Sequence, residues 1–160
     1  MEPLKLNDGQ KLLLKKELKK HCVTVLQQRI EELNQSVDAA REAANSEDKS
    51  SAGDKYETSR AMGHLQQEML GEQLETAMQE LDFVQGIEAG ILHNQVTLGC
   101  VLVTGEFAAF VAAGLGTVQL NAQKYFLLSP KAPLAVALHN KQQGDSVLFN
   151  GKQVVIRQVF

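Results

Sequence analysis

Residues 14–44 read LKKELKKHCVTVLQQRIEELNQSVDAAREAA, and their apolar side chains recur every three or four positions. The recurring positions are Leu14, Leu18, Cys22, Leu26, Ile30, Leu33, Val37, Ala40 and Ala44. This spacing places them along one face of an α-helix. Asn7 and Gln10 have the spacing of a capping pair, so we expect the helix to begin there. It should continue to about Asn45, over about 37 residues or ~55 Å.

A second apolar stripe follows further along the chain. It comprises Met62, Leu65, Met69, Leu74, Ala77, Leu81 and Val84. Each stripe is narrow, so each helix needs one partner along its length. Residues 45–53, NSEDKSSAG, contain no apolar side chain larger than alanine and are typical of a loop. The pattern therefore predicts an antiparallel coiled-coil hairpin over residues 1–87, with its tip near 46–54.

Charge supports the antiparallel arrangement. Five lysines lie near the start of the first helix: Lys11, Lys15, Lys16, Lys19 and Lys20. Four acids lie near the end of the second: Glu72, Glu75, Glu80 and Asp82. Folding about residue 50 would bring the two groups together within one chain, so we expect a monomer. Each exposed pair contributes only ~0.2–1 kcal/mol, and the alternative is that these charges merely solvate the helix faces.

The composition changes near residue 93. Residues 1–93 carry 11 basic and 17 acidic side chains, whereas residues 94–160 carry five basic and two acidic ones. Gly86 and Gly90 should end the helical region, with residues 88–95 as a linker and residues 96–160 as a second domain. The expected strands are residues 96–103, 107–113, 117–121, 125–128, 146–149 and 153–159.

Turn residues support this second domain. Asn150-Gly151 is typical of a type I′ turn and predicts a hairpin between the last two strands. Pro133 suits the first turn of one short helix, and Gly144-Asp145 suits the next turn. The expected class is therefore α+β, with a helical hairpin followed by a small sheet domain.

Composition excludes several classes of protein. The chain has 160 residues, and its longest apolar run is far short of the ~20 residues that a membrane span needs. The first 20 residues include six lysines and lack the pattern of a secretory signal. Cys22 and Cys100 form no C-x-x-C motif, which argues against a disulfide framework or a zinc ribbon. We therefore expect a cytoplasmic protein that does not contact membranes.

Motifs for catalysis are scarce. Gly114-x-Gly116 lacks the remainder of a nucleotide-binding loop and is typical of a turn. The histidines, which are His21, His64, His93 and His139, have no metal-ligand spacing. Basic residues in 94–160 are dispersed, which gives little support for direct nucleic-acid binding.

The acidic residues around the expected tip are the remaining feature. Asp54 and Glu57 have the D-x-x-E spacing of a helix cap, whereas Asp48 lies in mid-loop with no capping role. Mg²⁺ usually keeps waters and shares one or two protein carboxylates with phosphates. Such a tip could complete a metal site that belongs to another protein, but could not form one alone.

Residues 132–141, APLAVALHNK, are followed by Gly144-Asp145 and the terminal hairpin. This segment resembles the S-P-I-x-x-A-L-x-G-K segment and G-D turn of the Gre family of bacterial transcript-cleavage elongation factors. The order of helical hairpin, linker and sheet domain is also similar, over nearly the whole chain. Ala132 stands where the family has serine, and Asn140 where it has glycine.

The tip shows a partial resemblance to the same family. The family pattern is D-L-S-E-N-A-E-Y, which Asp48, Ser50 and Asp54 match. Ser51 replaces the second functional acid.

The resemblance implies an FKBP-like fold for the second domain and bacterial RNA polymerase as the partner. Lys131, Ala132, Pro133 and Leu134 would belong to the docking segment. The hairpin would enter the secondary channel of the polymerase, where Asp48 and Asp54 act in the polymerase site and Asp48 shares a Mg²⁺ ion. The chain would have no cofactor of its own, contact nascent RNA only indirectly, and stimulate the polymerase's own cleavage rather than act as an enzyme.

Three alternatives stay open. Because Ser51 replaces an acid, the protein could occupy the channel without stimulating cleavage. It could be an adaptor whose hairpin binds another partner. An FKBP-like fold also allows peptidyl-prolyl isomerase activity, although aromatic residues make up only 5% of the chain and tryptophan is absent.

Overall fold

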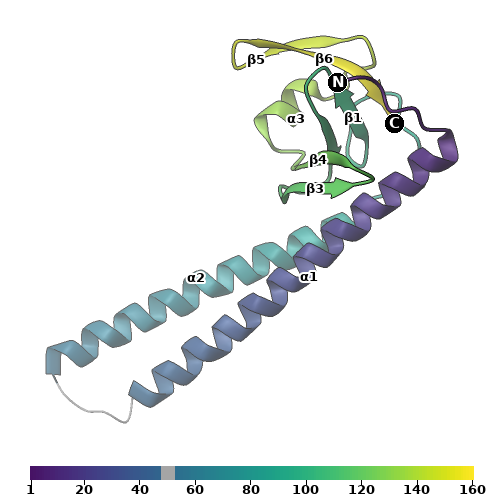
Figure 1. Ribbon diagram of the computed structural model, residues 1–160. Coiled ribbons are helices and arrows are strands. Elements are labelled where there is room, and N and C mark those ends of the chain that lie inside the picture. Colours follow the sequence, from purple (N-terminus) through teal and green to yellow (C-terminus); the bar gives the residue numbers. More distant parts are fainter. Residues whose placement is uncertain (48–52) are drawn as a thin grey trace. The chain divides into compact units, whose positions relative to one another are not determined.

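The computed structural model describes residues 1–47 and 53–160. It begins with two long helices, α1 (Asp8–Glu47) and α2 (Gly53–Gln85), and continues into a sheet of six strands with one short helix (Figure 1). The protein is therefore α+β, as predicted. The cap of α1 is also confirmed, because the Asn7 amide donates to Gln10 Oε1 at 3.0 Å and the Gln10 amide donates to Asn7 Oδ1 at 2.9 Å.

Contacts divide the chain into two compact units. The sheet unit comprises Met1–Thr24 and Phe83–Phe160, and the hairpin unit comprises Val25–Asp82. The first turns of α1 and the last turn of α2 thus belong to the sheet unit. The predicted boundaries at 1–87, 88–95 and 96–160 follow sequence pattern rather than contacts, and they stay a prediction.

The hairpin unit pairs α1 and α2 in antiparallel fashion. Arg29 Nη1 lies 3.8 Å from Glu80 Oε2, and the Gln67 side-chain amide donates to the Ala40 carbonyl oxygen at 3.4 Å. Moving along α1 toward the tip therefore moves backward along α2. The predicted α1 stripe is confirmed, because all nine of its positions, Leu14 through Ala44, are buried or half-buried.

The predicted α2 stripe is wrong in its first half. Met62, Leu65 and Met69 are 65%, 53% and 51% exposed. The positions that are buried or half-buried at steps of three and four are Gly63, Gln67, Leu70, Leu74, Ala77, Leu81 and Val84. The predicted stripe contained a step of five, from Met69 to Leu74, which breaks the helical period. Counting back from Leu74 in steps of four and three reaches Leu70, Gln67 and Gly63. Gln67 and Gly63 are not apolar, so an assignment based on hydrophobicity alone missed them.

The expected pairing between the lysines of α1 and the acids of α2 is also wrong. Among the described residues, the ion pairs are Lys11–Asp8 and Arg29–Glu80. Within the sheet unit, Lys19 Nζ donates instead to the carbonyl oxygens of Gln85 and Ile87, at 2.7 Å each. The register explains this result, because the lysine-rich turns of α1 lie beside the C-terminal end of α2 and the residues that follow it. Free carbonyls at a helix C-terminus attract cations.

The sheet has the strand order β3-β4-β2-β1-β6-β5. Its strands are β1 (Val101–Thr104), β2 (Ala108–Val111), β3 (Gly116–Leu120), β4 (Gln123–Leu128), β5 (Ser146–Phe149) and β6 (Lys152–Val159). The β2–β4 pair is parallel, and the other neighbouring pairs are antiparallel. The short helix α3 spans Pro133–Leu138. The six strands and the helix occur in the predicted order along the chain, although β1 begins at Val101 rather than at residue 96.

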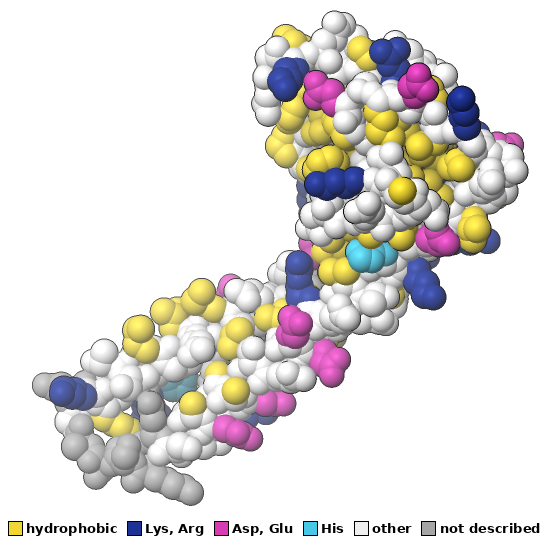
Figure 2. All heavy atoms as spheres, viewed as in Figure 1, with side chains coloured by type: hydrophobic (Ala, Val, Ile, Leu, Met, Phe, Trp, Pro, Cys, Tyr) yellow, Lys and Arg dark blue, Asp and Glu magenta, His cyan; other side chains and the backbone are white. Residues whose placement is uncertain are grey.

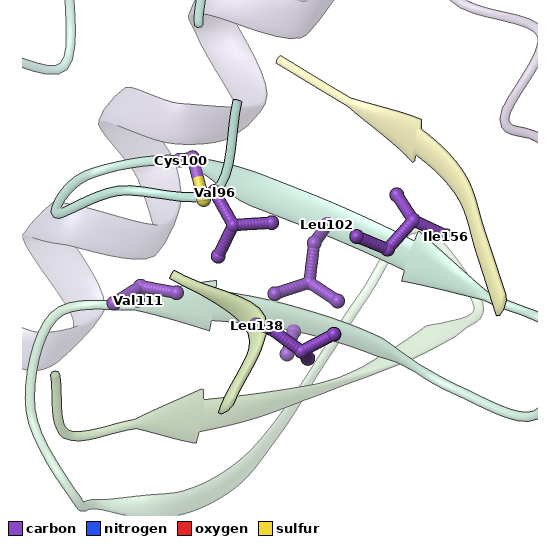
Figure 3. Packing of buried hydrophobic residues seen from close by; sticks show 7 residues of the cluster. Val96, Cys100, Leu102, Val111, Leu138 and Ile156 are labelled. Carbon is purple, nitrogen blue, oxygen red and sulfur yellow. The ribbon is translucent and has the colours of Figure 1, made fainter. Parts of the chain in front are cut away.

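The core of the sheet unit lies between the sheet and α3. Its buried members are Val96, Cys100, Leu102, Ala109, Val111, Leu138 and Ile156. Figure 3 shows Leu138 of α3 pointing toward Leu102 and Ile156 of the sheet. Because these side chains come from distant parts of the sequence, they hold β1, β2, β6 and α3 together.

Two glycines with positive φ shape the ends of the strands. Asn150 and Gly151 have φ values of 50° and 75°, which confirms the type I′ turn between β5 and β6. Gly99, at φ 78°, makes β1 begin later than predicted. A Cβ at Gly99 would lie 2.8 Å from Ile87 Cγ2, so both backbone and space require glycine there.

Candidate functional site

The tip residues are the first candidate site. Asp48, Ser50 and Ser51 lie outside the described residues. The structure places Asp54 as the second residue of α2 and does not describe its side chain. Among the residues that are described, no group of three or more His, Cys, Asp or Glu side chains could hold a metal ion. The assignment of Asp48 and Asp54 as tip acids thus stays a prediction from the sequence.

The docking segment at α3 is the second candidate site. Lys131 and Pro133 are exposed, and Ala132 and Leu134 are half-buried. Leu134 packs against the core and therefore anchors α3 to it. The accessible part of the predicted docking segment is therefore Lys131 and Pro133.

The structure describes the backbone at Ala132 and Asn140, the two positions where the α3 segment differs from the pattern that it resembles. Ala132 is the N-cap residue, with φ −62° and ψ 140°, and has no side-chain cap hydrogen bond. This is the backbone at which serine caps a helix. Asn140 has φ 62°, in the left-handed region that glycine adopts freely and asparagine tolerates. Both positions thus keep the backbone that serine and glycine would suit.

The turn after α3 is also fixed by a side chain. Asp145 Oδ2 accepts a hydrogen bond from the Gln142 amide at 2.8 Å, and the Asp145 amide donates to the Gln142 carbonyl at 3.0 Å. Gly144, at φ 95°, completes this turn. The predicted Gly144-Asp145 turn is confirmed.

Two exposed apolar side chains near α3 were missed from the sequence. Val136 is 61% exposed on α3, and Leu148 is 77% exposed on β5, which contacts α3. The signal was present in the spacing. Val136 is two residues from Leu134 and so points away from the buried face of the helix, and Leu148 alternates with half-buried Val147 and Phe149.

A further apolar surface lies on the hairpin unit. Hydrophobic side chains reach the surface along the hairpin, as Figure 2 shows. A hollow of about 870 Å³ opens between α1 and α2 beside Ala40, Ala44 and Gly63, and Met62 and Met69 also line it. Small residues at these inward positions leave the two helices loosely packed toward the tip.

Lys15 and His93 form a polar contact in the sheet unit that sequence reasoning also missed. Lys15 is fully buried, and its Nζ donates to the Ile91 carbonyl oxygen and contacts His93 Nδ1 at 2.8 Å. Burial lowers the pKa of Lys15 to about 8, an effect that the nearby Cys100 partly opposes. The sequence did hint that Lys15 is buried, because it directly follows Leu14, which belongs to the buried stripe of α1.

The two cysteines are structural residues. Cys22 and Cys100 are free and buried. Burial raises the pKa of each thiol to about 11. A buried thiol with a raised pKa is a poor nucleophile.

The structure is thus an α+β protein with a long helical hairpin and a six-stranded sheet that packs against the short helix α3. No known family model, curated protein or solved structure matches the chain. In the described part of the chain, no helix is both long and apolar enough to cross a membrane.

Proposed function

We propose that the protein is a Gre-like regulator of transcription elongation in the cytoplasm, which binds bacterial RNA polymerase as a monomer. The observation that carries this proposal is the backbone of the α3 segment. Ala132 and Asn140, the two departures from the family pattern, have the extended N-cap and left-handed conformations that serine and glycine would adopt. The segment therefore has a backbone that would suit the serine and glycine of the family pattern, although it lacks those side chains.

The hairpin supports the same proposal. Within the hairpin unit, α1 runs from Val25 to Glu47, which is about 35 Å at 1.5 Å per residue. Only two helices form this rod, and each contributes one narrow stripe to their contact. A thin rod of this kind is suited to a narrow channel.

The tip defines the proposed chemistry. Asp48 and Asp54 would add carboxylates to the active site of the polymerase, and Asp48 would help to hold a second Mg²⁺ ion there. A two-metal site uses such an ion to activate water for phosphodiester cleavage. The protein itself would supply the carboxylates, and the polymerase would carry out the reaction.

Cleavage of RNA in stalled, backtracked polymerase complexes tests this role. Asp48→Ala should abolish any Mg²⁺-dependent stimulation while leaving stability within about 0.5 kcal/mol and polymerase binding unchanged. Asp38→Ala is the matched control, because Asp38 is an exposed acid on α1 outside the tip. Efficient cleavage by both the wild type and Asp48→Ala would contradict the proposed role of the tip.

A second candidate function rests on Ser51. If the missing acid prevents stimulation, the wild type should bind polymerase without cleavage, and Ser51→Glu should raise cleavage. If all variants bind and none cleaves, the protein is a channel-occupying regulator. If purification recovers a different protein in place of polymerase, the adaptor hypothesis replaces both.

The docking surface has its own test. The double change Lys131→Glu, Pro133→Ala should weaken polymerase binding without unfolding the protein, because both side chains are exposed. Lys152→Glu on β6 is a control of the same charge change at another exposed lysine. Equal affinity of the folded double variant and the wild type would count against docking through α3.

A further inference from the structure

Two lysines of α1 hold the segment that joins α2 to β1. Lys15 Nζ donates to the Ile91 carbonyl oxygen and lies 2.8 Å from His93 Nδ1. One turn further along α1, Lys19 Nζ donates to the carbonyl oxygens of Gln85 and Ile87, at 2.7 Å each. The acceptors all lie within residues 85–93, so two ammonium groups tie this segment to α1.

The Lys15–His93 contact depends on the number of protons that the pair carries. His93 Nδ1 can accept a hydrogen bond from the Lys15 ammonium only while the imidazole is neutral, with its proton on Nε2. A proton on Nδ1 removes this acceptor and places two positive charges 2.8 Å apart. Like charges at this distance disfavour the doubly protonated pair. The contact can therefore hold one positive charge but not two.

Among the described residues, no ion pair balances a second charge at this contact. Lys15 is fully buried, and no carboxylate among the described residues forms an ion pair with it. The titratable groups that face Lys15 are His93, from the segment after α2, and the Cys100 thiol, just before β1. Burial raises the pKa of Cys100 to about 11, so this thiol stays uncharged at neutral and acid pH. Burial, followed by the charge of Lys15, lowers the pKa of His93 from its ordinary 6.5.

We propose that the Lys15–His93 contact is an acid-sensitive latch, in which protonation of His93 breaks this hydrogen bond and releases residues 92–95, while the lysine bonds to the Ile91 and Ile87 carbonyls stay in place. In the released segment, His93 regains its ordinary pKa of about 6.5. Linkage then favours the open form by up to about tenfold when the pH falls from 7.5 to 5.5. This proposal does not depend on the function proposed above.

Hydrogen–deuterium exchange on the purified protein tests the latch. After correction for intrinsic exchange rates, amides in residues 92–95 should exchange up to about tenfold faster at pH 5.5 than at pH 7.5, and amides in β4 should not. His93→Asn keeps an acceptor near the position of Nδ1 but cannot take up a proton, so its exchange should be equal at both pH values. His139→Asn, at an exposed position after α3, should keep the response of the wild type.

A second measurement uses the unmodified protein, so the test does not depend on the folding of a variant. The ¹⁵N chemical shifts of the His93 ring should show an unprotonated Nδ1 at pH 7.5 and an imidazolium at the pH where residues 92–95 open. A proton on Nδ1 at pH 7.5 would overturn the latch. An unchanged tenfold response in His93→Asn would overturn it as well.

Discussion

The sheet unit and the hairpin unit are stabilised in different ways. In the sheet unit, α1, β1, β2, α3 and β6 all contribute fully buried side chains, among them Phe110, Leu102, Leu138 and Ile156. In the hairpin unit, the fully buried side chains among the described residues are Leu26 and Ala77. Burial of apolar surface is the main stabilising term in folding. The sheet unit therefore holds most of the stability of the chain, and the hairpin unit depends on one narrow contact between two helices.

This difference fits a division of roles. A surface that docks on a partner works best on a rigid scaffold, which the sheet unit provides beneath α3. The proposed entry into a channel would require a thin hairpin, and a thin structure has little interior to bury. The small residues around Gly63 loosen its packing further. The following predictions test the contrast between the two units.

The largest contrast should come from one substitution made in both units. Leu102→Ala removes a fully buried side chain of β1 and should lower the free energy of unfolding by about 2–5 kcal/mol. Leu65→Ala removes a 53% exposed side chain of α2 and should change it by less than about 0.5 kcal/mol. Urea denaturation followed by circular dichroism measures both values. Similar losses in the two variants would contradict the contrast.

A smaller effect tests the corrected phase of α2. Leu70→Asn places a polar group at a half-buried position between the helices and should cost about 1–2 kcal/mol. Met69→Asn is adjacent in sequence but lies at a 51% exposed position, so its cost should be within about 0.5 kcal/mol. Thermal melting of the two variants compares them directly. If Met69→Asn lost more stability than Leu70→Asn, the helix face that contains Met69 would be the one that contacts α1, as hydrophobicity alone predicted.

These two pairs also show how far the sequence could predict the fold. The α1 stripe was found because Leu18, Cys22 and Leu26 are both apolar and regularly spaced. The α2 stripe was misplaced because Gly63 and Gln67 face α1 without being apolar, and Gln67 is held there by a hydrogen bond to the Ala40 carbonyl. A strict spacing of three and four residues rejects the step of five from Met69 to Leu74. Applied backward from Leu74, it would have identified the face of α2 that contacts α1.

The sheet unit was predicted more accurately because its turns carry specific residues. Asn150-Gly151 and Gly144 need positive φ values, and the chain has residues there that adopt them. Local rules do not predict contacts between distant residues. The Lys15–His93 contact joins positions 78 residues apart, and nothing in either neighbourhood pointed to the other. The assignment of Asp48 to the tip rests on the sequence, because Asp48 lies outside the described residues.

The pH dependence of stability should reflect groups that only the sheet unit buries. The pKa of Lys15 falls from 10.5 to about 8 on folding, so the unfolded chain binds more protons above pH 8 and stability should rise there. The pKa values of Cys22 and Cys100 rise from 9.0 to about 11, so stability should fall above pH 9 as the unfolded thiols ionise. Two cysteines outweigh one lysine, which predicts a maximum near pH 9.

The lysine contribution to this profile can be isolated. Lys15→Met should remove the rise between pH 8 and pH 9 and keep the decline above pH 9. Lys16→Met, at an exposed position on the same helix, should keep the maximum. Melting temperatures measured across pH 7–11 give both profiles. A wild-type profile that falls steadily from pH 8 would show that Lys15 keeps its proton in the folded protein.

The smallest effect concerns the N-cap of α3. Ala132 has the backbone of a capping residue but no oxygen to accept a hydrogen bond from the first turn. Ala132→Ser should therefore stabilise the sheet unit by about 0.5–1 kcal/mol, measured by urea denaturation. Ala137→Ser is the control, since a hydroxyl within the helix at a half-buried position has no free amide to cap and should not stabilise. If Ala132→Ser leaves stability unchanged but strengthens binding to polymerase, the serine of the family pattern acts on the partner rather than on the helix.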